Sequence, residues 1–300
     1  MPTTSRIIDI GDVPARLRVV NDLLAIGSGE KPEVTVPVGE VDALILSHPQ
    51  ATLTHAVLSR LTATGASLVF CDEKRQPCGM VLPLAGHGTQ AERFAVQAEA
   101  TLPMKKQAWM QVVKAKVLAQ ARLLRAARGV DGGLPDMAGK VRSGDPDNQE
   151  ARAARKYWPL LFGKGFTRDT EGGGLNSWLN YGYAVLRATV ARAICGSGLH
   201  PSLGLHHHNR YDTFRLASDL MEPYRPLVDG CVAALRGVHN GRELDKEVKR
   251  DILAALAGEF RCGGQIRSLA GWAMQTSHSL VEYYGGKRKR LFFPALPEGE

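Results

Sequence analysis

The sequence lacks the short motifs of several common enzyme classes. It contains no G-x-x-x-x-G-K-[ST] phosphate loop, no H-E-x-x-H, no G-x-S-x-G and no complete G-x-G-x-x-G after a predicted strand. These absences remove support for nucleotide hydrolysis and serine-esterase chemistry. No apolar run reaches the roughly 18 residues that span a bilayer, and the first residues do not lead into the apolar block of a signal peptide. We therefore expect a cytoplasmic protein that does not contact a membrane.

Cysteine is also sparse. The chain has 5 cysteines, an odd number, and no two of them form a C-x-x-C pair. This pattern predicts neither a disulfide framework nor a zinc ribbon, and we interpret all five as reduced structural thiols.

The length and the distribution of charge predict two domains. The chain has 300 residues, of which 44% are hydrophobic, enough to bury a sizeable core. Residues 1–85 contain 7 Lys and Arg against 9 Asp and Glu, whereas residues 86–300 contain 31 against 21. The excess positive charge in the second part indicates a polyanionic partner there.

Hydrophobic patterning assigns different secondary structure to the two parts. Short β-branched and apolar runs predict strands at 6–10, 23–27, 34–38, 42–46 and 67–71, with one helix at 52–61. The glycines of residues 83–88 indicate a linker. Beyond it, apolar periodicity predicts helices at 103–128, 149–162, 176–195, 213–236, 244–260 and 262–284. We therefore expect an α+β protein with a small β-rich domain (1–85) and a larger all-α domain (86–300).

The predicted helix from Pro103 to Arg128 has no acidic residue. Its basic residues are Lys105, Lys106, Lys114, Lys116, Arg122, Arg125 and Arg128. A solvated helix usually mixes charges of both signs, so this composition favours a surface that faces phosphates. The alternative is a solvated face whose composition arose by chance.

Two acidic stretches are candidate sites. In the first, Asp147 and Glu150 have the spacing of a capping box, in which Glu150 would bond a backbone N–H; the other interpretation is a metal ligand or catalytic acid. In the second, Asp219 and Glu222 are three residues apart, so on a helix they lie close enough to share a divalent cation. The alternative there is a core helix, kinked by its prolines, in which one acid pairs with Arg225.

Three adjacent histidines, His206, His207 and His208, precede the second acidic stretch. Neighbouring side chains in an extended segment point to opposite faces, so at most one or two of the three are expected to be functional.

Four separate motifs together resemble one protein family. They are Asp147-Asn148-Gln149-Glu150-Ala151 with Tyr157-Trp158, Leu179-Asn180-Tyr181-Gly182-Tyr183-Ala184, Gly204-Leu205-His206-His207-His208-Asn209 and Asp219-Leu220-Met221-Glu222-Pro223-Tyr224-Arg225-Pro226. Their order and spacing resemble those of the CRISPR-associated spacer-acquisition integrases, the larger of the two proteins common to adaptation. Among these, the motifs are most similar to those of type II systems. The resemblance covers nearly the whole chain.

The resemblance implies a metal-dependent DNA endonuclease and integrase. By position, the catalytic residues and ligands of Mg²⁺ or Mn²⁺ would be Glu150, His207 and Glu222, with Asp219 as a possible additional acid. The expected reaction is a transesterification in which a 3′-hydroxyl attacks a phosphodiester, so that new spacer DNA enters a CRISPR array. Such chemistry requires no high-energy cofactor, in agreement with the missing phosphate loop.

The resemblance also implies partners. These are double-stranded DNA (prespacer and repeat), a second copy of the chain joined through the β-rich domain, and a small ferredoxin-like adaptation protein that bridges two dimers into a heterohexamer. The side chains expected to contact DNA are Lys105, Lys106, Lys114, Lys116, Arg122, Arg125, Arg152, Arg155 and Arg225; Lys156 and the run Lys287–Arg290 could also follow the backbone. Tyr157 and Trp158 are expected to pack the helix that presents Glu150.

Two other functional classes remain open at this point. The chain could be a non-catalytic, basic nucleic-acid-binding scaffold whose acids are caps and core pairs. A zinc protein that uses the histidine triplet is a weaker alternative, because no cysteine ligands are spaced to complete it.

Overall fold

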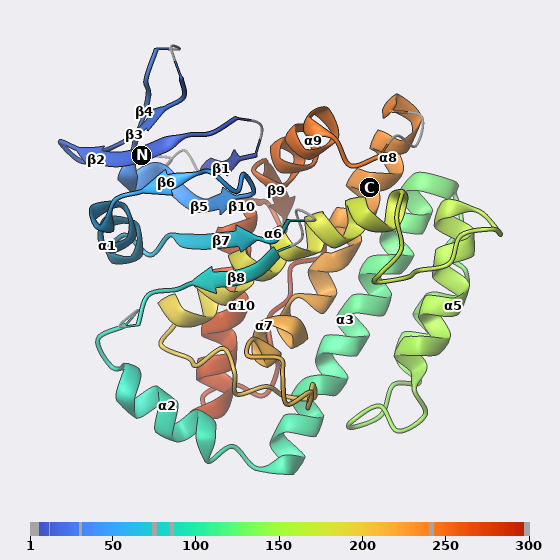
Figure 1. Cartoon of the computed structure of the whole chain (residues 1–300). Helices are drawn as coiled ribbons and strands as arrows, with labels where there is room; N and C mark the ends of the chain where they lie inside the picture. The colour runs from blue at the N-terminus through green and yellow to red at the C-terminus, as the bar shows by residue number, and fades with distance from the viewer. Residues whose placement is uncertain are drawn as a thin grey trace.

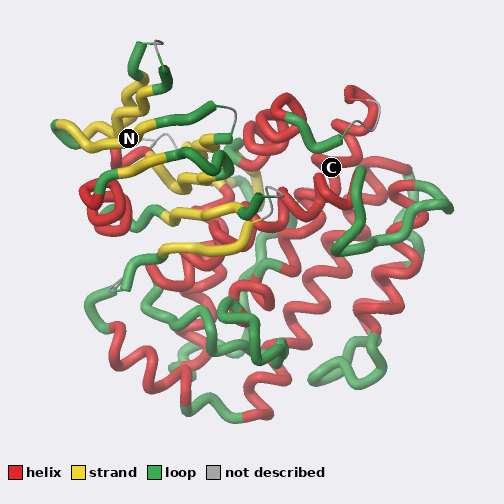
Figure 2. The backbone as a smooth tube through the Cα atoms, viewed as in Figure 1, coloured by secondary structure: helices red, strands yellow, loops and turns green. Residues whose placement is uncertain are grey.

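The protein combines a pair of small β-sheets with a larger bundle of helices (Figure 1). The computed structural model describes residues 6–11, 13–29, 32–73, 77–84, 87–239 and 243–296. Figure 2 shows most of the strands gathered at one side of the molecule and the helices filling the rest. This arrangement confirms the predicted α+β class, with a β-rich N-terminal region followed by a mostly helical one.

The N-terminal strands form two four-stranded sheets. In the first, with the order β1-β5-β7-β8, three parallel strands are followed by antiparallel β8 at the edge. The second has the order β4-β3-β2-β6. The elements are β1 (Arg6–Ile10), β2 (Arg16–Val20), β3 (Leu23–Gly27), β4 (Val34–Pro37), η1 (Val38–Glu40), β5 (Val41–Leu46), β6 (Thr52–Leu53), α1 (His55–Ala63), β7 (Ser67–Cys71) and β8 (Pro77–Val81). Leu17, Leu24, Leu44 and Leu68 form their shared core with Val57 of α1.

Strands β1, β3 and β7 have the predicted limits, whereas β2 was not predicted. It pairs with β3 through a two-residue turn, in which Asn21 and Asp22 have positive φ angles of 49° and 59°. Two-residue hairpin turns favour residues with positive φ, because the backbone twist of such a turn matches the twist of the paired strands. The Asn-Asp pair was therefore an available signal for this hairpin.

The second region contains α2 (Gln90–Ala98), α3 (Leu102–Arg128), α4 (Leu134–Gly139), α5 (Gln149–Phe162), α6 (Leu175–Gly196), α7 (Arg215–Leu220), η2 (Glu222–Tyr224), α8 (Arg225–His239), α9 (Lys246–Leu256), β9 (Glu259–Cys262), β10 (Gln265–Ser268) and α10 (Leu269–Tyr284). The prediction of an all-α domain is wrong at the hairpin β9–β10. Gly263 and Gly264 both have positive φ angles, 56° and 75°, and form its turn. The predicted helix at 213–236 is instead divided into α7, η2 and α8.

Helix α3 is the central helix of this region, and α4, α5, α8 and η2 pack against it. Thr101 caps its N-terminus by accepting a hydrogen bond from the Met104 N–H, and Gly129 ends it at a φ of 70°. Ten of its residues are buried, among them Trp109 and Leu124. The helix that the acid-free composition assigned to a DNA-facing surface therefore packs one face into the core.

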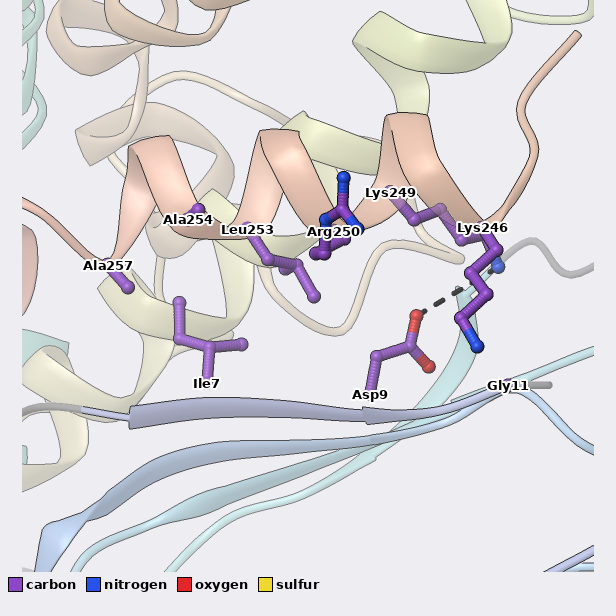
Figure 3. A pocket seen from close by; sticks show the side chains of 9 residues that line it. All are labelled: Ile7, Asp9, Gly11, Lys246, Lys249, Arg250, Leu253, Ala254 and Ala257. Atoms are coloured by element: carbon purple, nitrogen blue, oxygen red, sulfur yellow. Dashed lines mark ion pairs between the residues drawn. The ribbon is translucent and has the colours of Figure 1, made fainter. Parts of the chain in front are cut away.

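The sheets and the helices meet along α6. The Tyr181 hydroxyl donates to Asp9 Oδ2 of β1 at 2.6 Å, and Arg192 forms an ion pair with Asp42 of β5. Beside this contact, a cavity of about 370 Å³ lies between β1 and α9, where Lys249 reaches to 4.0 Å from Asp9 (Figure 3). None of the predicted site residues lines this cavity.

The predicted boundary at Ala85 lies outside the described residues, between β8 and α2. The division into domains 1–85 and 86–300 stays a prediction. Within the described ranges, no helix is both long and apolar enough to cross a membrane.

Candidate functional site

Glu150 is presented by the first turn of α5. Asp145 accepts hydrogen bonds from the backbone N–H groups of Gln149 and Glu150 at 2.9 and 3.0 Å, and Asn148 is the N-cap, with a φ of 51°. Asp147 forms an ion pair with Arg142 instead. The capping-box interpretation is therefore wrong. Because Asp145 and Asn148 bind the free N–H groups of the helix, the Glu150 carboxylate can point to another partner.

Glu222 lies at the break between α7 and α8. The break is the 3₁₀ turn η2, which contains Pro223, a residue that has no N–H to continue an α-helix. The Glu222 side chain is only 4% exposed, and its Oε1 lies 2.9 Å from Arg225 Nε. Both parts of the alternative interpretation, a proline-bent segment and an acid paired with Arg225, are thus present in the structure.

Lys116 of α3 joins the two glutamates. Its Nζ lies 2.5 Å from Glu150 Oε1 and 2.5 Å from Glu222 Oε2, and its side chain is only 13% exposed. Burial alone lowers the pKa of Lys116, but attraction to Glu222 and Glu150 outweighs this effect and raises it. Burial likewise raises the pKa of Glu222, but Arg225 and Lys116 hold it below its usual value. Lys116, Glu222 and Arg225 therefore carry their charges at neutral pH.

Asp219 organises the histidine loop from its fully buried position on α7. Its Oδ2 accepts hydrogen bonds from the N–H groups of Leu205 (2.6 Å) and His206 (3.2 Å), and its Oδ1 accepts one from the N–H of His207 (3.2 Å). A Cβ at Gly204 would lie 2.9 Å from Asp219 Oδ2, so only glycine leaves room for this approach. Asp219 is engaged by the loop, not turned with Glu222 toward a shared cation as predicted.

The three histidines have different surroundings. His206 stacks on Trp109 with ring centroids 4.4 Å apart, and burial lowers its pKa. His207 Nδ1 donates to Asp219 Oδ1, and this hydrogen bond raises the pKa of His207. The His208 side chain is exposed. Since their contacts diverge, the triplet does not converge as a zinc ligand set.

The donor set nevertheless fits a divalent cation. As they stand, no three His, Cys, Asp or Glu side chains of the described residues are close enough to hold a metal ion. However, carboxylates of Glu150 and Glu222 meet at one cationic group, Lys116 Nζ, and the Asp219 contact at Nδ1 leaves Nε2 as the other ring nitrogen of His207. Oxygen ligands with one imidazole suit Mg²⁺ and, more so, Mn²⁺.

A buried network behind Arg225 was not predicted from the sequence. The hydroxyl of Tyr157 donates to Asp229 Oδ2 at 2.6 Å, and the hydroxyl of Tyr183 donates to Asp229 Oδ1. Burial raises the pKa of Asp229 to about 6. The Arg225 guanidinium lies 4.6 Å from the centre of the Tyr183 ring and so connects this network to Glu222. Tyr157 packs α5, as expected, but it also bonds a buried acid.

Three of the predicted DNA contacts point into the protein. Lys116 and Arg225 pair with the glutamates, and Arg122 donates to the Leu296 carbonyl of the C-terminal segment at 3.3 Å. The partners of Lys116 and Arg122 lie far away along the chain, so the sequence placed both residues on the surface. The pair of Arg225 with Glu222, three residues apart, was the alternative interpretation.

The other basic candidates are at least partly exposed. Lys105 and Lys114 are half-buried; Arg125, which pairs with Asp131, is exposed, as are Lys106, Arg152, Arg155, Lys156 and the run Lys287–Arg290. Arg152, Arg155 and Lys156 all belong to α5, the helix that presents Glu150. Their contact with DNA stays a prediction.

Comparison with known proteins decides the family. The family model described as CRISPR associated protein Cas1 matches residues 10–248. The chain belongs to the Cas1 family. A relative named CRISPR-associated endonuclease Cas1, from Neisseria meningitidis serogroup C, is 39% identical over 232 residues, which are 74% of each chain. The predicted family is thereby confirmed, whereas the assignment to a type II system stays a prediction.

Solved structures share the Cas1 fold. A chain described as "Casposase bound to integration product" has a TM-score of 0.78 at 20% identity, covering 98% of this chain and 94% of that one. A chain of a "Cas6-RT-Cas1--Cas2 complex" has a TM-score of 0.75 at 16% identity, covering 97% of this chain and 36% of that one. At these identities the likeness shows the fold alone.

Proposed function

We propose that this Cas1-family protein is a metal-dependent DNA endonuclease and integrase that inserts new spacer DNA into a CRISPR array. The observation that carries the proposal is the convergence of Glu150 and Glu222 on one cationic group beside His207. The name of the Neisseria relative, an endonuclease, supports DNA cleavage, and the fold shared with a casposase bound to its integration product supports integration.

The proposed reaction is a transesterification in which a 3′-hydroxyl attacks a phosphodiester and displaces another 3′-hydroxyl. Glu150, His207 and Glu222 would hold Mg²⁺ or Mn²⁺, which supplies activation of the attacking hydroxyl and stabilisation of charge in the transition state. Asp219 fixes the His207 tautomer and the course of its loop. Arg225 holds Glu222 in place from its other oxygen.

The exposed basic side chains of α5 would position DNA. Arg152, Arg155 and Lys156 follow Glu150 on the same helix and can bind phosphates without reading base sequence. Holding the reacting ends in line lowers the entropic cost of the reaction.

The proposed assembly is a homodimer, formed through the β-rich region, with a small ferredoxin-like partner bridging two dimers into a heterohexamer. One structural neighbour belongs to a complex that includes Cas2, which supports a Cas2-type partner.

The deciding experiment is an integration assay on supercoiled DNA that contains a repeat. We expect strand transfer of a labelled prespacer with Mg²⁺ or Mn²⁺ and the small partner, and none in EDTA. Metal-dependent nicking of branched DNA by the protein alone separates the proposal from the scaffold alternative. A scaffold would bind the branched DNA and leave it intact.

A further inference from the structure

Lys116 lies where the two predicted carboxylate ligands face each other. The same ammonium contacts Glu150 Oε1 and Glu222 Oε2, each at 2.5 Å. Glu222 Oε2 is buried and accepts no hydrogen bond of good geometry from the described residues. Within that part of the chain, its polar contact is the ion pair with Lys116. A metal ion held by both carboxylates would compete with Lys116 for this position.

The charges around this contact are balanced without a metal. Lys116 and Arg225 offset the charges of Glu150 and Glu222, and Arg225 reaches Glu222 through the other oxygen, Oε1. The buried carboxylate of Glu222 and the partly exposed one of Glu150 would repel each other if Lys116 were neutral. Arg225 would keep its contact with Oε1 if a metal were held through Oε2, whereas Lys116 would have to give up its contact with Oε2.

We infer that Lys116 is a resident cation of the site, which holds Glu150 and Glu222 together in the metal-free protein and which a divalent metal displaces. The inference rests on the proposed function, because it takes both glutamates as metal ligands. Lys116 is a positioning residue in this scheme. It stabilises the empty site and, by the same contacts, lowers the affinity for the metal.

The experiment measures Mn²⁺ binding to the full-length chain after treatment with EDTA, by calorimetric titration. Lys116→Met removes the charge and keeps an unbranched apolar stem, so we expect Mn²⁺ to bind at least about tenfold more tightly. In EDTA the same variant should melt at a lower temperature than the wild type, and Mn²⁺ should raise its melting temperature by more. A merely structural role for Lys116 predicts the opposite change in affinity, since a loosened site binds metal less well.

Lys114→Met is the matched control, because Lys114 lies on the same helix and makes no ion pair with either glutamate among the described contacts. It should leave the Mn²⁺ affinity unchanged. Lys116→Arg is the second variant, for use if Lys116→Met does not fold. A guanidinium can bond two carboxylates at once, so we expect weaker Mn²⁺ binding.

The outcomes separate the inference from the proposed function. If the wild type binds no Mn²⁺, or if Glu222→Gln binds it equally well, the metal site itself is wrong. If the wild type binds Mn²⁺ through Glu222 and Lys116→Met binds it no more tightly, the inference alone is overturned. If Lys116→Arg binds Mn²⁺ as tightly as the wild type or more tightly, the inference is likewise overturned.

Discussion

His207 Nδ1 lies 2.5 Å from Asp219 Oδ1, on a carboxylate that also receives three backbone N–H groups of the histidine loop. One buried acid therefore sets both the path of the loop and the tautomer of its central histidine. In the proposed metal site, His207 would therefore bind through Nε2.

Asp219→Asn should reduce strand transfer strongly, although Asp219 is no ligand in our scheme. An amide can accept at one oxygen only, so part of the loop's hydrogen bonding is lost. The hydrogen bond to Asp219 raises the pKa of His207 above its usual value of 6.5. Because only a neutral imidazole binds metal, the wild-type activity should already decline at a pH higher than 6.5 as the pH is lowered. In the variant the residual activity should persist to lower pH. A pH profile of integration checks this, and an acid limb that does not move would contradict it.

Alanine substitutions should rank the three histidines. We expect His207→Ala to abolish metal-dependent strand transfer and to weaken Mn²⁺ binding. His206→Ala removes the stack on Trp109 and should be mild, and His208→Ala should be intermediate through loss of DNA or loop contacts. Integration assays and metal titrations on the three variants test the order. Retained activity in His207→Ala together with loss in His206→Ala would show that the assignment is displaced by one residue.

Glu150→Gln and Glu222→Gln should each abolish strand transfer while DNA binding is retained. Glu150 makes no cap hydrogen bond, and a glutamine there can still accept a hydrogen bond from Lys116, so its variant should lose only about 1 kcal/mol of unfolding free energy. Asp147→Asn is the matched control, because Asp147 is an exposed acid beside α5 that pairs with Arg142. It should remain active. Urea denaturation and the integration assay give the two readouts; full activity in either glutamine variant would refute the assignment of that residue.

The buried acid Asp229 should make stability depend on pH. Its folded pKa, about 6, lies above the usual value of 3.8, so the folded protein holds this proton more tightly than the unfolded chain does. Stability contributed by the group is complete at low pH and is lost as the pH rises from about 4 through about 6. Relative to Asp229→Asn, the wild type should lose up to about 3 kcal/mol over this window and nothing further above it. Urea denaturation of both proteins at several pH values measures the difference, and parallel curves would contradict the shift.

The exposed basic residues of α5 should govern the salt dependence of DNA binding. Each phosphate contact adds about 0.9 to the slope of log affinity against log salt. Reversing Arg152, Arg155 and Lys156 to glutamate should therefore flatten the slope without altering sequence preference. Arg250→Glu, at an exposed position on α9, is the control. Binding titrations at several salt concentrations test this; an unaltered slope in the triple variant would place the DNA elsewhere.

Apolar periodicity predicted the long helices well, because α3, α5 and α6 bury continuous faces. The hairpin β9–β10 was missed, since its short strands interrupt a helical pattern and only Gly263 and Gly264 mark the turn. The motifs singled out Glu150, His207 and Glu222, and the structure brings both glutamates to one lysine.

The role of Lys116 could not be read from the sequence. Its partner Glu150 is 34 residues away, on another helix, and the acid-free composition of α3 favoured a surface that faces phosphates. The missing acids are in fact supplied by α5 and η2. A local count of charges on one helix cannot detect neighbours that only tertiary packing provides.

Three consecutive residues of α6 have separate partners, and this has a mechanical consequence. Tyr181 bonds Asp9 in the first sheet, Tyr183 bonds Asp229 on α8, and a Cβ on Gly182 between them would lie 2.5 Å from Val228 Cγ1. Helix α6 is thus tightly packed against α8 at Gly182. A rotation of the N-terminal sheet that turned α6 would shift the Tyr183 ring under Arg225, and with it the guanidinium that holds Glu222. Neighbouring residues of α6 thus link the N-terminal sheet to the surroundings of Glu222.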